Sequence, residues 1–453
     1  MTETISNINK SYLSYKDNTP LMFLKTSFLK DDKKQALKFF KGKIKNVFLF
    51  RDLLLFLNEV VNSRFYRQDL WRLLDPVITC EKEQIMMECF SSCGSIYARV
   101  DIFENIFDSY ELLSRGTTNV NFNRDFIESL LSLKMSNESF IEVGRDEILL
   151  ESDNKVSKEK KVKLPERWIK GFLQSQSIIS KSKLFYELNS INSKKLILEC
   201  QKTVSDKEYY LLEENKSLVL KHIRPQKGNY ITISGLNRLN LLKRLIPYIE
   251  KLKIYYIKEN NSTLWLIKTP NANISFSISA SIKNGFSGEG ESLRNLSLNR
   301  DETIDDFILE MIKNLGSFDI EQLSEISEIS KNELIQCLEN LSINGILGFN
   351  SEKQKYFYRV LPFADKLNSR FENSKNILKK SDIDIEEIEK NDNRLFIKGW
   401  VQGINSKYYT YVNINNSYIE NAQCNCSWFI KNELKRGPCK HILALRFFGE
   451  SQV

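Results

Sequence analysis

The spacing of apolar residues changes along the chain, and the change separates a helical region from a strand-rich one. In residues 33–66, KKQALKFFKGKIKNVFLFRDLLLFLNEVVNSRFY, apolar residues recur at intervals of three and four, which predicts an amphipathic helix or a pair of helices. From about residue 80 the apolar runs shorten to IMMECF and IYARVDI, with the turn sequence SSCG between them. We therefore expect a helical N-terminal region over residues 1–75 and strands beyond it.

The strand-rich body shows similar patterns at a constant offset of 111 residues. This offset relates Glu88-Cys89 to Glu199-Cys200, Val120 and Phe122 to Ile231 and Ile233, Leu130-Leu131 to Leu241-Leu242, and Ile141 and Val143 to Leu252 and Ile254. Such register predicts a duplicated strand–helix–hairpin body, with α+β units over residues 76–170 and 171–295. In the second unit, Asn260-Asn261 is a plausible hairpin turn.

The phrase VNFNRDFIESLLSL followed by FIEVGRDEILLES is similar in pattern to one unit of the sliding-clamp proteins, in which helices support a curved sheet. No clamp-specific motif accompanies the pattern. A generic two-lobed α+β body explains the same spacing, and we prefer it at this point.

Residues 302–362 show three helical stretches followed by two short strands around SEKQK. Asp319 is a good N-cap for the second helix, and Ser330 with Glu333 has capping-box spacing at the start of the third. This order resembles a winged-helix domain. Residues 302–361 hold eleven acidic and five basic residues, a net charge of −6, whereas DNA binding requires cations at the phosphates. We therefore expect a domain that binds protein, in which only the wing residues Lys353, Lys355 and Arg359 have the sign to meet DNA.

A polar, helical linker is expected over residues 363–390, before a strand that begins near Arg394. In residues 391–453, LFIKGWVQG and YYTYVNINNSYIENAQCNCS alternate as strands, and KHILALRFF follows Pro438 as a helix. Cys424 and Cys426 lie one residue apart at the end of the last strand, and Cys439 and His441 have the same spacing where the helix begins. Three thiolates and an imidazole are the ligands of closed, structural zinc sites, and they do not suit magnesium or calcium.

The arrangement C-x-C-x12-C-x-H, formed by Cys424, Cys426, Cys439 and His441, resembles the SWIM zinc finger family. The resemblance covers about 60 residues and implies a ββα finger with one bound zinc ion (Zn). SWIM fingers are regarded as DNA- or protein-binding modules, and in bacteria they accompany helicase-type ATPases and assemblies with AAA ATPases. The family includes both DNA-binding and protein-binding modules, so the resemblance leaves the finger's partner open.

Charge suggests what the finger contacts. The whole chain carries +8, but residues 424–448 hold five Lys/Arg and one Glu. The candidates are Lys431, Lys435, Arg436 and Lys440, which surround the zinc ligands in the sequence and which we expect to contact DNA or RNA. The alternative is a protein–protein adaptor in a multi-subunit assembly, with the acidic winged helix as its docking module.

Composition narrows the remaining possibilities. The chain of 453 residues suggests about three domains, which gives an α+β multidomain protein. No apolar run spans a membrane and no secretory signal begins the sequence, so a reducing cytoplasmic location is expected. With only two histidines, one of them a zinc ligand, a Ser-His-Asp or Cys-His hydrolase is not expected, and we predict a protein without enzymatic activity.

Overall fold

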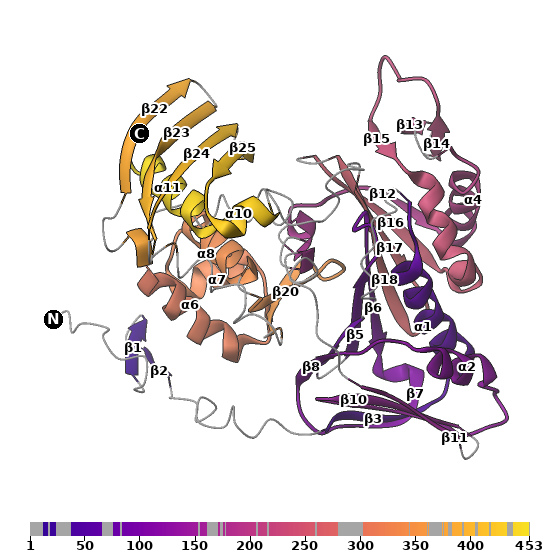
Figure 1. Cartoon of the computed structure of the whole chain (residues 1–453). Coiled ribbons are helices and arrows are strands. Elements are labelled where there is room, and N and C mark those ends of the chain that lie inside the picture. The colour runs from indigo at the N-terminus through magenta and orange to yellow at the C-terminus, as the bar shows by residue number, and fades with distance from the viewer. Residues whose placement is uncertain are drawn as a thin grey trace.

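The computed structural model describes residues 38–65, 76–279, 302–361 and 383–452, with gaps inside these ranges, together with part of 374–378 and the backbone of 12–16 and 19–23. These residues form a large α+β body, a three-helix domain and a four-stranded C-terminal domain (Figure 1). Among the described residues, every helix is too short or too polar to cross a bilayer.

The body is mixed, with helical segments between groups of antiparallel strands. Its main elements are β3 (Lys38–Ile44), α1 (Val47–Asn62), β4 (Val77–Cys80), β5 (Gln84–Phe90), β6 (Ile96–Phe103), β7 (Phe107–Leu112), β8 (Gly116–Asn119), α2 (Arg124–Ser132), β9 (Ser139–Gly144), β10 (Glu147–Ser152), β11 (Lys155–Lys160), β12 (Lys183–Asn189), α4 (Ser190–Cys200), β13 (Glu208–Glu214), β14 (Ser217–Lys221), β15 (Tyr230–Ser234), the 3-10 segment η4 (Leu236–Tyr248), β16 (Lys251–Ile257), β17 (Ser262–Lys268) and β18 (Ala272–Ile278).

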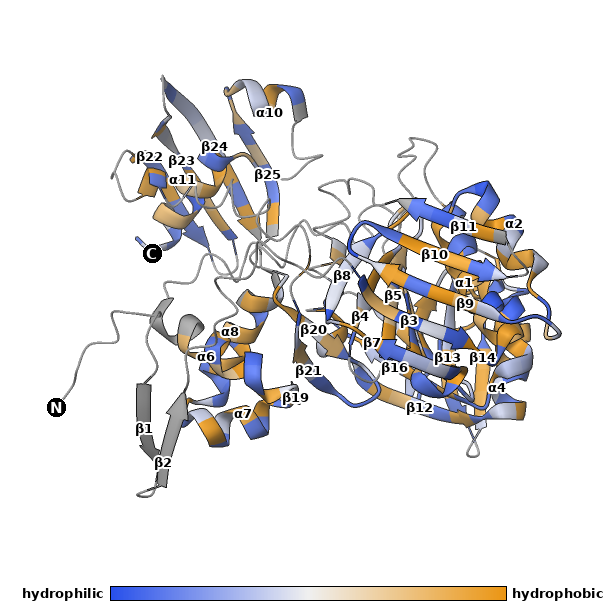
Figure 2. Ribbon diagram, turned by 90° about the horizontal axis from the view of Figure 1, so that it is seen from below, coloured by the Kyte–Doolittle hydropathy of each residue, from blue (hydrophilic) through white to orange (hydrophobic). Residues whose placement is uncertain are grey.

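Three sheets build the body. The largest has eight strands in the order β12-β16-β17-β18-β6-β5-β4-β8, so that β18, late in the body, pairs with the early strand β6. The second has the order β11-β10-β9-β3-β7, and the third has the order β14-β13-β15. Figure 2 shows both hydrophobic and hydrophilic residues along β9 and β10. This agrees with the burial of their side chains, which alternates along much of both strands.

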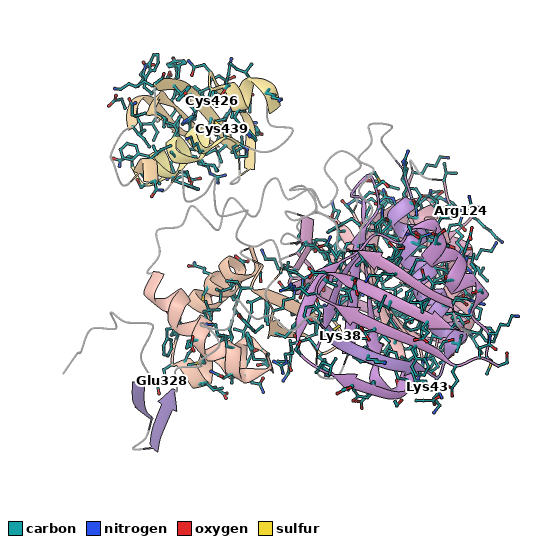
Figure 3. All side chains as sticks on the ribbon, turned by 60° about the horizontal axis from the view of Figure 1, so that its bottom comes forward. Lys38, Lys43, Arg124, Glu328, Cys426 and Cys439 are labelled. Atoms are coloured by element: carbon teal, nitrogen blue, oxygen red, sulfur yellow. The ribbon has the colours of Figure 1, made fainter. Side chains whose placement is uncertain are left out.

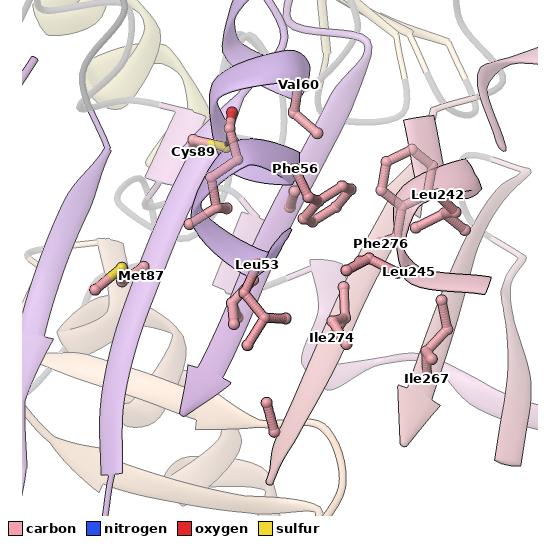
Figure 4. Packing of buried hydrophobic residues seen from close by; sticks show 14 of the residues in the cluster. Leu53, Phe56, Val60, Met87, Cys89, Leu242, Leu245, Ile267, Ile274 and Phe276 are labelled. Atoms are coloured by element: carbon pink, nitrogen blue, oxygen red, sulfur yellow. Dashed lines mark hydrogen bonds between the residues drawn. The ribbon is translucent and has the colours of Figure 1, made fainter. Parts of the chain in front are cut away.

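The core of the body lies between the large sheet and the helical segments above it. Leu53 and Phe56 of α1 lie near Leu242 and Leu245 of η4, as Figure 4 shows. The ring of Phe56 also lies 6.1 Å from that of Phe276 in β18, measured between centroids. All five side chains are fully buried. Truncating one buried phenylalanine to alanine typically costs about 3–5 kcal/mol, so this layer stabilises the body substantially.

Within the part of residues 1–75 that the structure describes, the expected helical region is correct only for α1. Residues Lys38–Ile44 form a strand that pairs with β7 and β9, and Tyr12–Lys16 pairs with Thr19–Phe23 in a separate two-stranded sheet. The helix begins after Asn46, whose side chain accepts a hydrogen bond from the Leu49 N–H at 3.3 Å. The apolar spacing of KFFKGKI fits both the helical period and the strand period. Pairing with β7 on one side and β9 on the other stabilises the segment as a strand.

One of the predicted correspondences between the two units is wrong. Glu88-Cys89 lies in strand β5, whereas Glu199-Cys200 ends helix α4. Two of the other three matches join elements of the same kind, the helical segments α2 and η4 and the strands β9 and β16. In the third match, Ile231 and Ile233 lie in β15, whereas Val120 is a single bridge residue and Phe122 lies outside any strand. The expected hairpin after Asn260-Asn261 is formed by β16 and β17.

The elements of the three-helix domain follow the predicted order, with one additional short strand between the first two helices that was not predicted. They are α6 (Glu302–Leu315), β19 (Ser317–Phe318), α7 (Ile320–Ser327), α8 (Lys331–Ile343), β20 (Leu347–Asn350) and β21 (Lys355–Tyr358), with the strands in the order β19-β21-β20. Asp319 caps α7 by accepting from the Gln322 N–H at 2.8 Å. Ser330 accepts from the Glu333 N–H at 3.3 Å, so both predicted caps are confirmed.

The C-terminal domain is larger than predicted. It contains β22 (Ile383–Asn391), β23 (Arg394–Gln402), β24 (Lys407–Asn415), β25 (Tyr418–Cys424), α10 (Ser427–Asn432) and α11 (Lys440–Glu450). The strands form one antiparallel sheet in chain order, and α11 packs on it. The expected linker over 363–390 is therefore wrong at its end, because the charged sequence IDIEEIEKN pairs with β23 as an edge strand. The finger has four strands rather than two.

Candidate metal centre

Two short segments of the C-terminal domain bring together three thiols and an imidazole. Cys424 is the last residue of β25, and Cys426 immediately precedes α10. Cys439 is the N-cap of α11, and His441 lies in its first turn. Figure 3 shows Cys426 and Cys439 close together inside this domain. All four side chains are buried, with at most 4% of the surface of each residue exposed.

The spacing of the donor atoms fits one tetrahedral ion. All four lie within 4.8 Å of one another, and the Cys424 Sγ is 3.7 Å from the Nδ1 of His441. Zinc bonds of about 2.3 Å to sulfur and about 2.0 Å to nitrogen would separate these two atoms by about 3.5 Å at the tetrahedral angle. The sequence predicted these same four ligands. They are the group of candidate metal ligands that is found within the described residues.

Neighbouring groups hold the ligands in place. The Thr410 hydroxyl donates to the Cys424 Sγ at 3.4 Å, and the Phe429 N–H lies 3.3 Å from the Cys426 Sγ. Tyr408 stacks on the His441 ring with centroids 4.3 Å apart. These contacts are the second layer that fixes ligand orientation in metal sites.

Gly403 allows the imidazole to sit where it does. A Cβ at this position would lie 2.5 Å from the Tyr408 ring and 3.1 Å from the His441 Nε2. A larger residue would therefore displace the stacked pair, so the backbone must approach His441 closely here.

Electrostatics favour a thiolate in the cluster. The pKa of Cys426 is lowered well below its ordinary value by hydrogen bonds from the Cys424 and Cys439 thiols. A cation bound between the sulfurs would replace these mutual hydrogen bonds. With four protein ligands no position remains for substrate or an activated water, so the zinc that this site fits is structural.

The predicted contact residues surround the site unevenly. Lys431 is exposed at the end of α10, and Lys440 is partly buried at the start of α11. Lys435 and Arg436 lie outside the described residues. Arg446, which contributes to the basic charge of this region, is fully buried and pairs with Glu450 at 2.8 Å, so it is not a surface cation.

A zinc-stabilised module of strands and helices is thus the class of protein domain that this geometry defines. Residues 412–445 match the family model of the SWIM zinc finger, and this range includes all four donors. The chain therefore carries a SWIM zinc finger at its C-terminal side. A comparison with curated protein sequences found no match.

Solved structures similar to the chain are sliding clamps of the PCNA type. Proliferating Cellular Nuclear Antigen from Entamoeba histolytica shares 14% identity at a TM-score of 0.36, over 53% of this chain and 98% of that one. The PCNA2–PCNA3 complex from Sulfolobus tokodaii shares 10% at 0.38, also over 53% and 98%. A. fulgidus PCNA bound to the C-terminal region of FEN-1 shares 11% at 0.36, over 53% and 97%. These are the proteins that the weaker sequence resemblance indicated.

Proposed function

We propose that this protein is a non-enzymatic binding protein whose zinc finger contacts nucleic acid. The observation that supports this most directly is the placement of two cations beside the metal ligands. Lys431 is exposed on the helix that follows Cys426, and Lys440 directly follows Cys439. Three thiolates and a neutral imidazole leave a zinc site with a formal charge of −1, so these cations also balance the centre. A fixed cluster of cations suits the phosphate backbone.

The non-enzymatic part of this proposal is supported by the surroundings of the two histidines. His441 is a donor of the zinc site. His222 is exposed and contacts the ring of Tyr209, with centroids 4.9 Å apart. The cysteines beside His441 are the other three donors of the zinc site, so this arrangement is used for binding metal.

A salt titration of nucleic-acid binding tests this function. The full chain is mixed with labelled single-stranded DNA, double-stranded DNA or RNA of mixed sequence at increasing salt. Four phosphate contacts give a log–log slope of about −3 to −4 on duplex DNA. Replacing Lys431, Lys435, Arg436 and Lys440 with Gln should flatten the slope while zinc content stays at one per chain.

A matched control replaces four exposed or partly exposed lysines of the body, and it should leave the slope unchanged. These are Lys38, Lys41, Lys134 and Lys158. Absence of binding to all three nucleic acids at low salt would contradict the proposal, since electrostatic attraction is strongest there.

The second candidate function is a protein–protein adaptor, and the contacts of the hairpin in the three-helix domain favour it. We infer that this domain is winged-helix-like but that its wing does not bind DNA. Arg359 is buried against Glu88 of the body, and Lys355 lies 3.6 Å from Asp319 and 3.1 Å from Gln322. Two of the three cationic side chains predicted for the wing therefore already contact acceptor groups of this same chain. A pull-down with and without nuclease separates the two candidates, because an adaptor retains its protein partners after nuclease.

We also infer that the body arose from two related units. Two of the four pattern matches at the 111-residue offset join elements of the same kind, which supports this origin. A superposition of the two halves in an experimental structure tests it, and failure of α2 and β9 to superpose together on η4 and β16 would contradict it.

A further inference from the structure

One face of the finger's sheet is open and aromatic. Helix α11 covers the opposite face, where Ile397, Val401 and Val412 are buried. Because side chains alternate along a strand, the residues between these point away from α11. On β22 the register shifts between Ile385 and Glu387, and the contacts of Glu386 with Trp400 and Tyr409 place it on the same side. The residues on this side form what we call the outer face, which contains Asp384, Glu386, Glu387, Glu389, Phe396, Lys398, Trp400, Lys407, Tyr409 and Tyr411.

The aromatic residues of the outer face lie in two neighbouring pairs. Trp400 of β23 is directly opposite Tyr409 of β24, with ring centroids 5.0 Å apart. Phe396 and Tyr411 form the second pair at 6.1 Å. Trp400 is 37% exposed, and the other three rings are partly exposed. Four rings in this position leave apolar surface in water, which is typical of a surface that binds a partner.

A carboxylate is held beside the first aromatic pair. The indole N–H of Trp400 donates to the Glu386 Oε1 at 2.7 Å, and the Tyr409 hydroxyl donates to the Oε2 at 3.2 Å. Both donors are neutral, so they orient the carboxylate without cancelling its charge. Within the described part of the chain, no salt bridge is formed by Glu386, which is itself exposed.

Charge along the outer face is also uneven. Four carboxylates lie on β22, which is an edge strand of the sheet. Lys407 pairs with Asp384 at 2.7 Å and Lys398 with Glu387 at 3.6 Å, which offsets two of them. Lys398 also lies 5.8 Å from the centre of the Tyr409 ring, so a cation already occupies part of this aromatic surface.

From this juxtaposition we propose that the outer face binds an arginine-containing, extended segment of a protein partner. One guanidinium stacks on Trp400 and Tyr409 and pairs with the carboxylate of Glu386. A planar guanidinium suits this site better than an ammonium, because it stacks on rings and donates two parallel hydrogen bonds to a carboxylate. The free edge of β22 gives an extended segment a strand to lie along.

Charge complementarity selects this occupant over single-stranded nucleic acid. Aromatic rings on a sheet can stack bases as well. The acidic strand beside the rings would repel the phosphates of that ligand, however, and would attract a cationic chain. The proposal does not depend on the nucleic-acid function of the basic residues around the zinc site, since it uses a different set of side chains.

Binding of labelled peptides to the full-length, zinc-loaded protein tests the proposal. The probes are fluorescein-labelled nonapeptides that alternate Arg and Ser, Lys and Ser, or Glu and Ser, and a nine-nucleotide oligothymidylate. Anisotropy should report binding of the Arg peptide, weaker binding of the Lys peptide and none of the Glu peptide. Both Trp400→Leu and Glu386→Gln should weaken the Arg peptide by roughly tenfold, since each removes one of the two interactions.

Two controls keep the experiment decisive. Glu128→Gln makes the same charge change on α2 of the body and should leave the affinity unchanged. Zinc content and thermal melting of each variant show whether the finger is folded. The proposal is overturned if the Arg peptide does not bind the wild type, or if folded Glu386→Gln binds it as well as wild type does. Oligothymidylate binding that falls in Trp400→Leu and rises in Glu386→Gln would assign the outer face to nucleic acid instead.

Discussion

Arg359, just after β21, donates to both carboxylate oxygens of Glu88 in β5, although 271 positions separate the two residues. Both side chains are buried. Burial by itself would raise the pKa of Glu88, but the charges of Arg359 and Arg99 outweigh it and hold the pKa below its ordinary value. Glu88 also accepts from the hydroxyl of Tyr97 at 2.5 Å.

Backbone groups complete this junction between the body and the three-helix domain. Arg99 donates to the Phe349 carbonyl at 2.7 Å, and the Phe349 N–H donates to the Gln176 side chain at 2.9 Å. The hairpin of the three-helix domain is therefore fixed to the large sheet by polar groups that are satisfied only together.

Removing Arg359 should leave a buried carboxylate without its main partner. We expect Arg359→Leu to lower the free energy of unfolding by about 3 kcal/mol, whereas Arg359→Leu with Glu88→Gln should recover much of that loss. Chemical denaturation followed by circular dichroism measures both. Arg124→Leu removes an exposed pair with Glu128 and should change stability by less than about 0.5 kcal/mol. Equal losses in the single and double variants would contradict the prediction.

Glu159 in β11 should make the body less stable as pH rises. Burial raises the pKa of this carboxyl to about 7, and one of its oxygens has no hydrogen-bond partner. In the unfolded chain its pKa is about 4.3. The folded state therefore holds the proton more tightly, so the protonated carboxyl favours folding below about pH 4.3 and this advantage is lost as pH rises toward 7.

Glu159→Gln should remove this dependence and stabilise the protein at pH 8 by on the order of 2 kcal/mol. Urea unfolding of wild type and variant between pH 5 and pH 8 measures the difference, which should grow with pH. Glu151→Gln, at an exposed position of β10, is the control. A constant difference across this range would refute the assignment.

Loss of zinc should unfold the finger and spare the body. The four ligands tie the end of β25 to the start of α11, and α11 covers the inner face of the sheet. Because metal binding and folding are coupled in such sites, chelation should expose residues 383–452 to protease. The fragment that contains the body core should resist digestion.

Cys424→Ser with Cys426→Ser should reduce the metal content from one zinc per chain to none. Cys93→Ser changes a partly buried cysteine outside the site and should keep full zinc content. Elemental analysis decides this, and full zinc content in the double variant would exclude the assigned ligands.

The sequence pattern predicted a structural feature correctly where the contacts that form it lie within a few residues of one another. The caps at Asp319 and Ser330 form between residues three positions apart, so sequence spacing alone predicts them. The zinc ligands follow the same principle, since each pair has fixed spacing and the sequence offers no other four-ligand set. The segment KFFKGKI was misjudged because its local pattern fits a helix and a strand equally, and pairing with β7 and β9 selected the strand.

The sequence by itself therefore determined the zinc ligands, the helix caps and the order of elements in the three-helix domain. Only the tertiary structure decided that Arg359 is buried on Glu88 rather than exposed on a wing. It also decided that Trp400, Tyr409 and Glu386 share an open face, because α11 covers the other side of the sheet. Alternation shows which residues share a face of a strand, but the packing of a distant element determines which face meets solvent.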